Sequence, residues 1–161
     1  MMEKSNLKNI RGQIVYSEKE ILLGLKMMER LDKVTDMMLF LLEHRNLYFS
    51  YILMSADDKN LKAILRKEKR ETDLLLPIDV DQNLYVIICQ ETKIEGGYRF
   101  SERLIRKLEV EEESKHQHHC AVLTVSSLKH SFRQIIFHLL DIYISQRNDK
   151  TRQAQITLRT I

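Results

Sequence analysis

The string HQHHC at residues 116–120 brings three histidines and a cysteine close together. Imidazole nitrogens and thiolates are the ligands that zinc prefers, and side chains two residues apart share one side of a strand. His116, His118 and Cys120 would therefore stand on one side of a strand. The sequence offers no second cluster of such ligands that would complete a tetrahedral site. We interpret the string as a polar loop that enters a strand, and we predict no metal centre there.

Other kinds of chemistry leave weaker signals. No G-x-S-x-G string surrounds a serine, and no glycine-rich phosphate loop precedes a helix. A cationic segment at residues 59–70 contains only one acid, Glu68. Such a face meets either an anionic partner or solvent. Its basic side chains are Lys59, Lys62, Arg66, Lys67, Lys69 and Arg70.

An apolar hairpin at residues 73–92 is the strongest structural pattern in the chain. The runs DLLLPID and NLYVIICQET flank the short break VDQ, and Asp79, Asp81 and Asn83 supply turn chemistry. The second run is apolar without alternation, which is typical of a strand that is covered on both faces. We therefore expect this hairpin in the middle of a sheet.

The remaining segments alternate between helical and strand patterns. Ser17 followed by Glu20 is a capping box, and it begins one long helix, or two helices with a bend near Asp32. The whole order predicts an α+β or α/β sandwich, with a five-stranded mixed sheet and flanking helices. The further predicted strands are 47–55, 119–126 and 155–161, and the further predicted helices are 58–70, 95–112 and 131–146.

Composition limits the class of protein. The chain has 161 residues, of which 43% are hydrophobic and 30% charged, and these values predict one soluble globular domain. A net charge of +3 is too small to indicate nucleic acid as a partner. Cys89 and Cys120 lie in apolar runs, which favours reduced, buried thiols. The first residues have no apolar segment and no run approaches ~20 residues, so we expect a cytoplasmic protein without a membrane span.

The order of elements and several short strings resemble a GGDEF domain, the palm-like nucleotidyl cyclase fold that makes cyclic di-GMP. The family begins with D-x-L-T-G-L-x-N-R, and residues 20–28 read EILLGLKMM. Residues 85–92 and 101–106 are similar to the strand after the family signature and to the A-E-R-L-R helix. Residues 123–126 and 139–147 are similar to the T-V-S strand and the final helix. The resemblance covers residues 20–161 and leaves residues 1–19 as an N-terminal extension.

The parts of the family pattern that carry chemistry are altered. The signature G-G-D/E-E-F aligns with DQNLY at residues 81–85. In the family, glycines let the backbone approach the guanine nucleotide, whereas Asp81 and Gln82 carry side chains that obstruct this approach. Leu84 stands where the family has a carboxylate for magnesium. The resemblance therefore implies a hairpin tip that has lost its function.

The magnesium site is reduced in the same way. The family's first strand ends in D-x-D, and here it ends in Ser55-Ala56-Asp57. Magnesium takes an octahedral shell of oxygens and usually one or two carboxylates with phosphate. The vestigial Asp57 would not by itself restore the several kcal/mol that a metal supplies. Arg147 stands at one of the family's phosphate contacts, but we expect no catalytic residue, no metal and no cofactor.

A second string, GGYRF at residues 96–100, looks like a corrupted signature. An apolar strand should follow the signature, but the helix-like SERLIRKLE follows instead. We interpret the two glycines as a loop that turns into a helix.

One ligand site of the family has a counterpart. Many GGDEF domains carry an R-x-x-D inhibitory site shortly before the signature, and Arg70-Glu71-Thr72-Asp73 stands at that place. The resemblance implies that Arg70 donates to guanine O6 and N7 of cyclic di-GMP and that Asp73 accepts from N1 and N2. Arg66 and Lys67 would serve the phosphates. A second interpretation stays open: a helix end whose cations compensate its dipole, with Asp73 closing a turn.

The sequence thus favours a catalytically inactive GGDEF-like module of bacterial cyclic di-GMP signalling. Its expected partners are a signalling or scaffold protein in trans, cyclic di-GMP, and a second copy of the chain as a homodimer. Two other hypotheses stay open. One is an active magnesium-dependent nucleotidyl cyclase that uses Asp57 with Asp79 or Asp81. The other is a structural interaction domain without a ligand.

Overall fold

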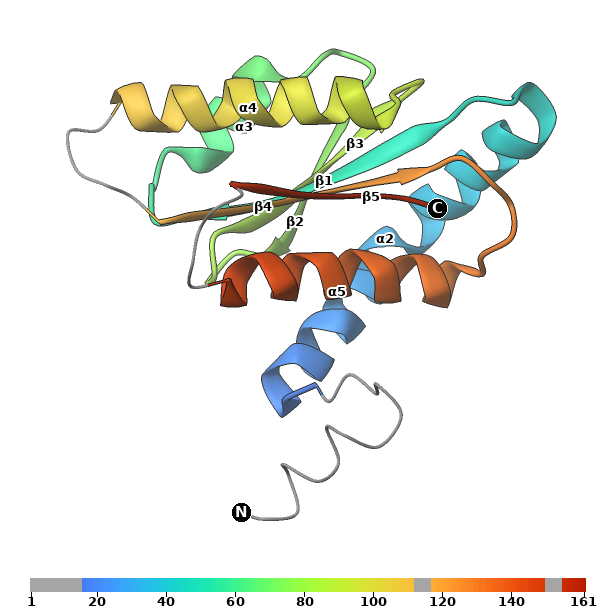
Figure 1. Ribbon diagram of the computed structural model, residues 1–161, viewed down its shortest axis with the longest axis horizontal. Helices are drawn as coiled ribbons and strands as arrows, with labels where there is room; N and C mark the ends of the chain where they lie inside the picture. Colours follow the sequence, from blue (N-terminus) through green and yellow to red (C-terminus); the bar gives the residue numbers. More distant parts are fainter. Residues whose placement is uncertain (1–15, 112–116, 150–154) are drawn as a thin grey trace.

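The computed structural model describes residues 16–111, 117–149 and 155–161 (Figure 1). This part of the chain forms an α+β fold with a five-stranded mixed sheet. The helices are α2 (Glu18–Arg45), α3 (Leu61–Glu68), α4 (Ile94–Glu111) and α5 (Phe132–Asn148). The strands are β1 (Phe49–Ala56), β2 (Leu74–Asp79), β3 (Leu84–Gln90), β4 (His118–Val125) and β5 (Ile156–Thr160). The predicted order of elements is confirmed.

The sheet has the strand order β2-β3-β1-β4-β5. β1 pairs antiparallel with both β3 and β4, and β2 pairs antiparallel with β3. The run from β1 to β4 is therefore a split βαβ arrangement. α5 returns the chain so that β5 pairs parallel to β4.

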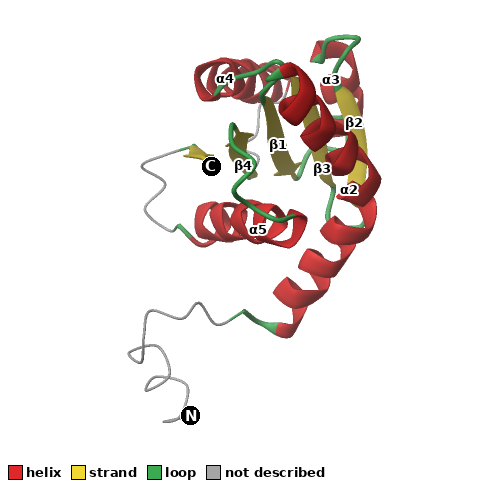
Figure 2. Ribbon diagram, turned by 90° about the vertical axis from the view of Figure 1, so that its right-hand side faces the viewer, coloured by secondary structure: helices red, strands yellow, loops and turns green. Residues whose placement is uncertain are grey.

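Helices cover both faces of the sheet, and each face has its own core. Figures 1 and 2 show α3 and α4 on one face and α2 and α5 on the other. The core under α2 and α5 contains Tyr51 and Leu53 of β1, and the core under α3 and α4 contains Ile52 and Met54. All eight residues of β1 are buried, since this strand is the middle strand of the sheet and helices cover both of its faces.

The first helix is continuous through Asp32, so the alternative of two helices is wrong. Its predicted start is confirmed: the side chain of Ser17 accepts from the Glu20 amide, and Glu20 accepts from the Ser17 amide. Two of its apolar side chains, Ile21 and Leu25, are 52% and 54% exposed. The buried residues are Leu23, Gly24, Met27, Leu31, Thr35, Met38 and Leu42.

The hairpin is not in the middle of the sheet. β3 is an inner strand with six buried residues in succession, but β2 is an edge strand that pairs only with β3. Its side chains are mostly half-buried, and its ladder shifts register between Pro77 and Asp79. Proline lacks an amide hydrogen and therefore suits an edge.

Gly97 lies inside α4 rather than in a turn before it. A Cβ at this position would stand 2.7 Å from Val122 Cγ1 of β4. The glycine therefore allows α4 to pack close against the sheet. The next residue, Tyr98, has a side chain that is 39% exposed.

Candidate functional site

The loop at residues 70–73 connects α3 to the edge strand β2. The Asp73 amide donates to the Arg70 carbonyl over 3.0 Å, and the Arg70 amide donates to Asp73 Oδ2 over 2.9 Å. These two bonds close a tight turn. The predicted structural role of Asp73 as the residue that closes this turn is therefore confirmed.

The Arg70 side chain folds back over the same turn. Its Nε and Nη2 donate to Asp73 Oδ1 over 3.1 and 2.9 Å. Nη2 also donates to the Gln90 carbonyl and to Thr92 Oγ1, over 2.7 and 2.9 Å, at the end of β3. The hydrogen bond with Asp73 is the largest cause that raises the pKa of Arg70, so the guanidinium stays charged. Arg70 thus fastens the loop to the inner strand.

The two members of this ion pair differ in access. The Arg70 side chain is 54% exposed, whereas the Asp73 side chain is 2% exposed and directs its carboxylate at Arg70. A ligand therefore reaches the outer side of the guanidinium and not the carboxylate. Hydrogen bonds from a guanine edge to the Asp73 carboxylate would need this turn to open.

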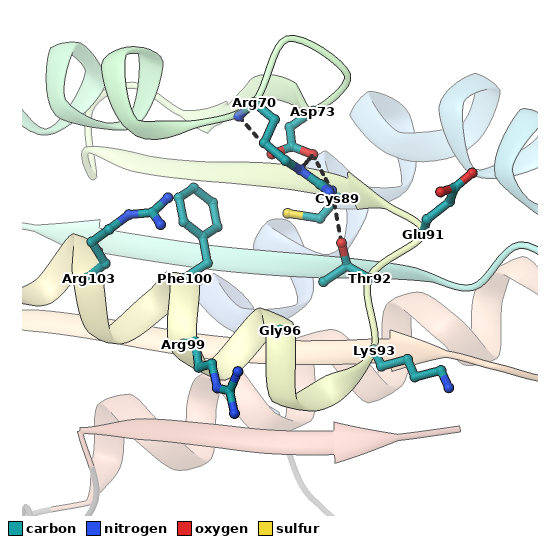
Figure 3. Close-up of a pocket in the computed structure, with 10 residues that line it drawn as sticks. All are labelled: Arg70, Asp73, Cys89, Glu91, Thr92, Lys93, Gly96, Arg99, Phe100 and Arg103. Atoms are coloured by element: carbon teal, nitrogen blue, oxygen red, sulfur yellow. Dashed lines mark hydrogen bonds and ion pairs between the residues drawn. The ribbon is translucent and has the colours of Figure 1, made fainter.

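Arg70 and Asp73 line a hollow of about 500 Å³ between the loop, the end of β3 and the first half of α4 (Figure 3). Phe100 and Arg103 project from α4 on the side that faces Arg70, and Arg99 points the other way (Figure 3). Cations outnumber acids along the wall. The remaining lining residues are Cys89, Glu91, Thr92, Lys93 and Gly96.

Arg103 is held in place by neighbours. Its Nε lies 3.5 Å from Glu68 Oε2, and its Nη2 donates to the Glu68 carbonyl at the end of α3. Its guanidinium carbon stands 4.9 Å from the centre of the Phe100 ring, a cation–π contact. The hollow therefore has a second fixed guanidinium opposite Arg70, beside an aromatic ring.

The loop side of this hollow was predicted from the sequence, and its helix side was not. Gly96, Phe100 and Arg103 follow helical spacing, which places them on one face of α4. That spacing is the signal that would have found them. Arg66 and Lys67, the predicted phosphate contacts, lie at exposed positions of α3 and are not lining residues of the hollow.

Cys89 contributes a neutral thiol to the wall. Burial, followed by the nearby Asp73 charge, raises the pKa of Cys89 to about 12, although Arg70 acts in the opposite direction. The thiolate is the nucleophilic form of cysteine, so this side chain is inert near neutral pH.

The hairpin tip is tied to the end of β1. Asn83 takes a positive φ of 52° and donates its side-chain amide to the carbonyls of Ala56 and Asp58, over 2.6 and 2.7 Å. Leu84 is buried beside it, with 1% of its surface exposed. The tip is therefore occupied by internal contacts.

The carboxylates of the expected magnesium region do not form a cluster. Asp57 is exposed, and Asp79 binds Lys26 with a distance of 3.0 Å between Oδ2 and Nζ. Burial pushes the pKa of Asp79 upward, but the hydrogen bond from Lys26 and that from the Gln82 amide outweigh it, so its pKa is lowered. Within the described ranges, no group of three or more His, Cys, Asp or Glu side chains is placed to hold a metal ion.

A second hollow, of about 260 Å³, lies between the tip, α2 and α5. Lys19, Lys26 and Arg147 line it together with Asp79, and Arg147 Nη2 stands 3.6 Å from Glu20. Lys26 and Arg147 are thus paired within the protein. Asp58, which was not predicted as a site residue, is 1% exposed, and its Oδ2 has no hydrogen-bond partner among the described residues.

No protein-family model matches the chain, and no curated protein matches it. None of the described helices combines the length and the apolar character that crossing a membrane requires.

Proposed function

We propose that this protein is a non-catalytic, GGDEF-like signalling module that binds cyclic di-GMP in the hollow between Arg70 and α4 and passes the signal to a partner protein in trans. The observation that carries the proposal is the pair of fixed guanidinium groups, Arg70 and Arg103, beside the Phe100 ring. Guanidinium groups bind phosphate and the O6 and N7 edge of guanine, and aromatic rings stack on bases.

The arrangement of the chain supports the same reading. The motifs that carry the GGDEF resemblance occur in the order in which the structure has its elements, and Arg70 precedes the hairpin as the inhibitory site would. The positions of the exposed cations suggest how the ligand would lie. Arg70 would contact one guanine with its outer side, and Arg103 would contact a second base or a phosphate.

Calorimetric titration of the full chain with cyclic di-GMP tests the ligand. We expect saturable binding that weakens at least tenfold in Arg103→Ala, since a charge-assisted bond is worth roughly 1.5–3 kcal/mol. Arg106→Ala is the matched control, because Arg106 is exposed on the same helix but does not line the hollow. Absence of heat at millimolar ligand, or equal affinities in the two variants, would remove the ligand from the proposal.

Arg70→Ala needs its own control, because this change also leaves the buried Asp73 without its cation. Thermal unfolding of the variant, recorded first, separates loss of fold from loss of binding. A folded Arg70→Ala protein that binds cyclic di-GMP as tightly as the parent would contradict the assigned site.

The proposal includes the absence of cyclase activity. Asn83 and Leu84 occupy the tip with internal contacts, and Asp79 is engaged by Lys26. We expect no cyclic dinucleotide when the protein is incubated with GTP and magnesium. Product formation that disappears in Asp57→Ala would instead establish the magnesium-dependent enzyme.

A further inference from the structure

The outer edge of β5 is open in the described part of the chain. β5 ends the sheet and pairs with β4 on one side only. Beyond it, the Ile161 amide donates to the Thr124 carbonyl over 2.9 Å, and the Ile161 carbonyl accepts from the Ser126 amide over 2.7 Å. In a parallel ladder, alternate residues turn both backbone groups to the same neighbour. The backbone groups of Thr157 and Arg159 therefore point toward β4. Those of Ile156, Leu158 and Thr160 point outward, away from the sheet.

The two edges of this sheet are protected to different degrees. Edge strands usually carry a proline, a bulge or a cover, because unpaired backbone groups recruit other strands. β2 has Pro77 and a shift of register, and α2 packs against it. β5 has no proline and no shift of register, and its Leu158 side chain is 42% exposed.

An apolar hollow of about 300 Å³ adjoins this open edge. Ile94, Tyr98 and Leu158 form its apolar wall, and Glu95 and Arg99 border it from α4. Strand addition combines backbone pairing with such pockets for alternate side chains. The edge and the hollow together form one surface suited to an added strand.

We propose that the strand added at this edge is β5 of a second copy of the chain, in an antiparallel pair whose twofold axis passes midway between the two Leu158 residues. This register places Leu158 opposite the partner's Leu158, and Ile156 opposite the partner's Thr160. These are the residues whose backbone groups point outward, so they form hydrogen-bonded pairs across the axis. The two sheets become one continuous sheet through an isologous interface.

Charge favours a second copy as the occupant. Leu158 shares its hollow with Glu95 and Arg99, so the axis passes near this turn of α4. A twofold axis reverses the direction of the partner helix and brings the partner's Arg99 toward Glu95, and the reciprocal pair forms as well. Both side chains are exposed. Arg159 adds no repulsion, because its Nη2 lies 3.0 Å from Asp141 Oδ2.

This interface does not depend on the proposed ligand. Among the described residues, only Arg99 borders both hollows, and the variants below leave it unchanged. Loss of cyclic di-GMP binding would therefore leave the dimer intact, and loss of the dimer would leave the ligand site intact.

Sedimentation equilibrium of the full chain up to millimolar concentration tests the assembly. We expect a dimer for the parent and for Thr160→Val, which keeps the outward amide. Thr160→Pro removes that amide without removing a bond to β4, and we expect its dissociation constant to rise at least tenfold. A monomeric parent, or equal association of the two variants, would overturn the interface.

Cross-linking tests the register. Residues in a hydrogen-bonded antiparallel pair have Cα atoms about 5.5 Å apart, a distance that a disulfide spans. Cys89 and Cys120 are buried, so they do not compete under mild oxidation. We expect Leu158→Cys to form a covalent dimer and Val80→Cys, whose position is 67% exposed on the hairpin, to stay uncoupled. Equal rates of coupling for the two variants, or none for Leu158→Cys, would refute the Leu158 axis.

Discussion

The side-chain amide of Asn83 donates a hydrogen bond of 2.7 Å to the backbone carbonyl of Asp58. This bond joins the tip of the β2–β3 hairpin to a residue two positions after the end of β1. A second bond from the same amide reaches the Ala56 carbonyl. The tip therefore adds side-chain hydrogen bonds between β1 and β3, two strands that already pair along their length.

Asn83 is expected to contribute to stability in two separable ways. Its amide satisfies two carbonyls, and its φ of 52° is tolerated by asparagine and glycine better than by other residues. We expect Asn83→Ala to lower the free energy of unfolding by about 2–4 kcal/mol and Asn83→Gly by about 1–2 kcal/mol. Urea unfolding measures both. If the two variants lose the same stability, backbone conformation contributes nothing at this position.

The two adjacent glycines of α4 should respond in opposite directions to alanine. A methyl group at Gly97 would stand 2.7 Å from Val122 Cγ1, whereas one at Gly96 would stand 3.3 Å from Thr92 Cγ2 at an exposed position. We expect Gly97→Ala to destabilise the protein by about 1–3 kcal/mol. Gly96→Ala should be neutral or stabilise it by at most ~1 kcal/mol, since alanine favours helix. Thermal unfolding measures both variants. A melting temperature of Gly97→Ala equal to or above that of Gly96→Ala would contradict the close packing of α4 on β4.

A buried hydroxyl pair couples α2 to β1. Thr35 Oγ1 and the Tyr51 hydroxyl lie 2.5 Å apart, and both residues have no exposed surface. Either Thr35→Val or Tyr51→Phe leaves one hydroxyl without its partner, at a cost of about 1–3 kcal/mol. The double variant removes both groups, so we expect it to lose less stability than the two single changes together. Chemical denaturation of all four proteins completes the cycle, and strict additivity would mean that the hydroxyls do not interact.

The two thiols predict a loss of stability in alkaline solution. Burial raises the pKa of both Cys89 and Cys120 from 9.0 to about 12. The folded protein therefore keeps both protons above the pH at which the unfolded chain releases them. This stability is complete below pH 9 and declines as pH rises toward 12, by about 2 kcal/mol between pH 9 and pH 10 for the two thiols together.

Urea unfolding across that interval checks the linkage. The double variant Cys89→Ala/Cys120→Ala lowers stability at every pH because it leaves cavities, so the slope is the quantity to compare. We expect a shallower slope in the double variant. An unchanged slope would assign the alkaline loss to other groups, such as Tyr16, whose pKa burial also raises to about 12.

Local patterns in the sequence predicted the elements well. Ser17 and Glu20 marked the start of α2, and the unbroken apolar run of β3 indicated an inner strand. These signals depend on neighbours within a few residues. The position of β2 at an edge could not be predicted in the same way, because its half-buried leucines read like those of an inner strand until the pairing is known.

Only the loop side of the candidate site was predicted, for a related reason. Arg70 and Asp73 interact across three residues, so their string is visible in the sequence. Arg103 lies opposite them only because α4 crosses the same face of the sheet as α3. The exposed Ile21 and Leu25 show the same limit, since the packing of α5 decides which side of α2 is buried.

The central place of β1 has a consequence for synthesis of the chain. Its two sheet neighbours, β3 and β4, both follow it, and β4 ends only at Val125. A growing chain therefore presents an apolar strand with two unpaired edges until β3 has been made, and with one unpaired edge until β4 follows. Such a segment is prone to aggregation and needs long-range closure before it is covered. Slow translation between residues 56 and 118 would thus lengthen the period in which a nascent chain depends on chaperones.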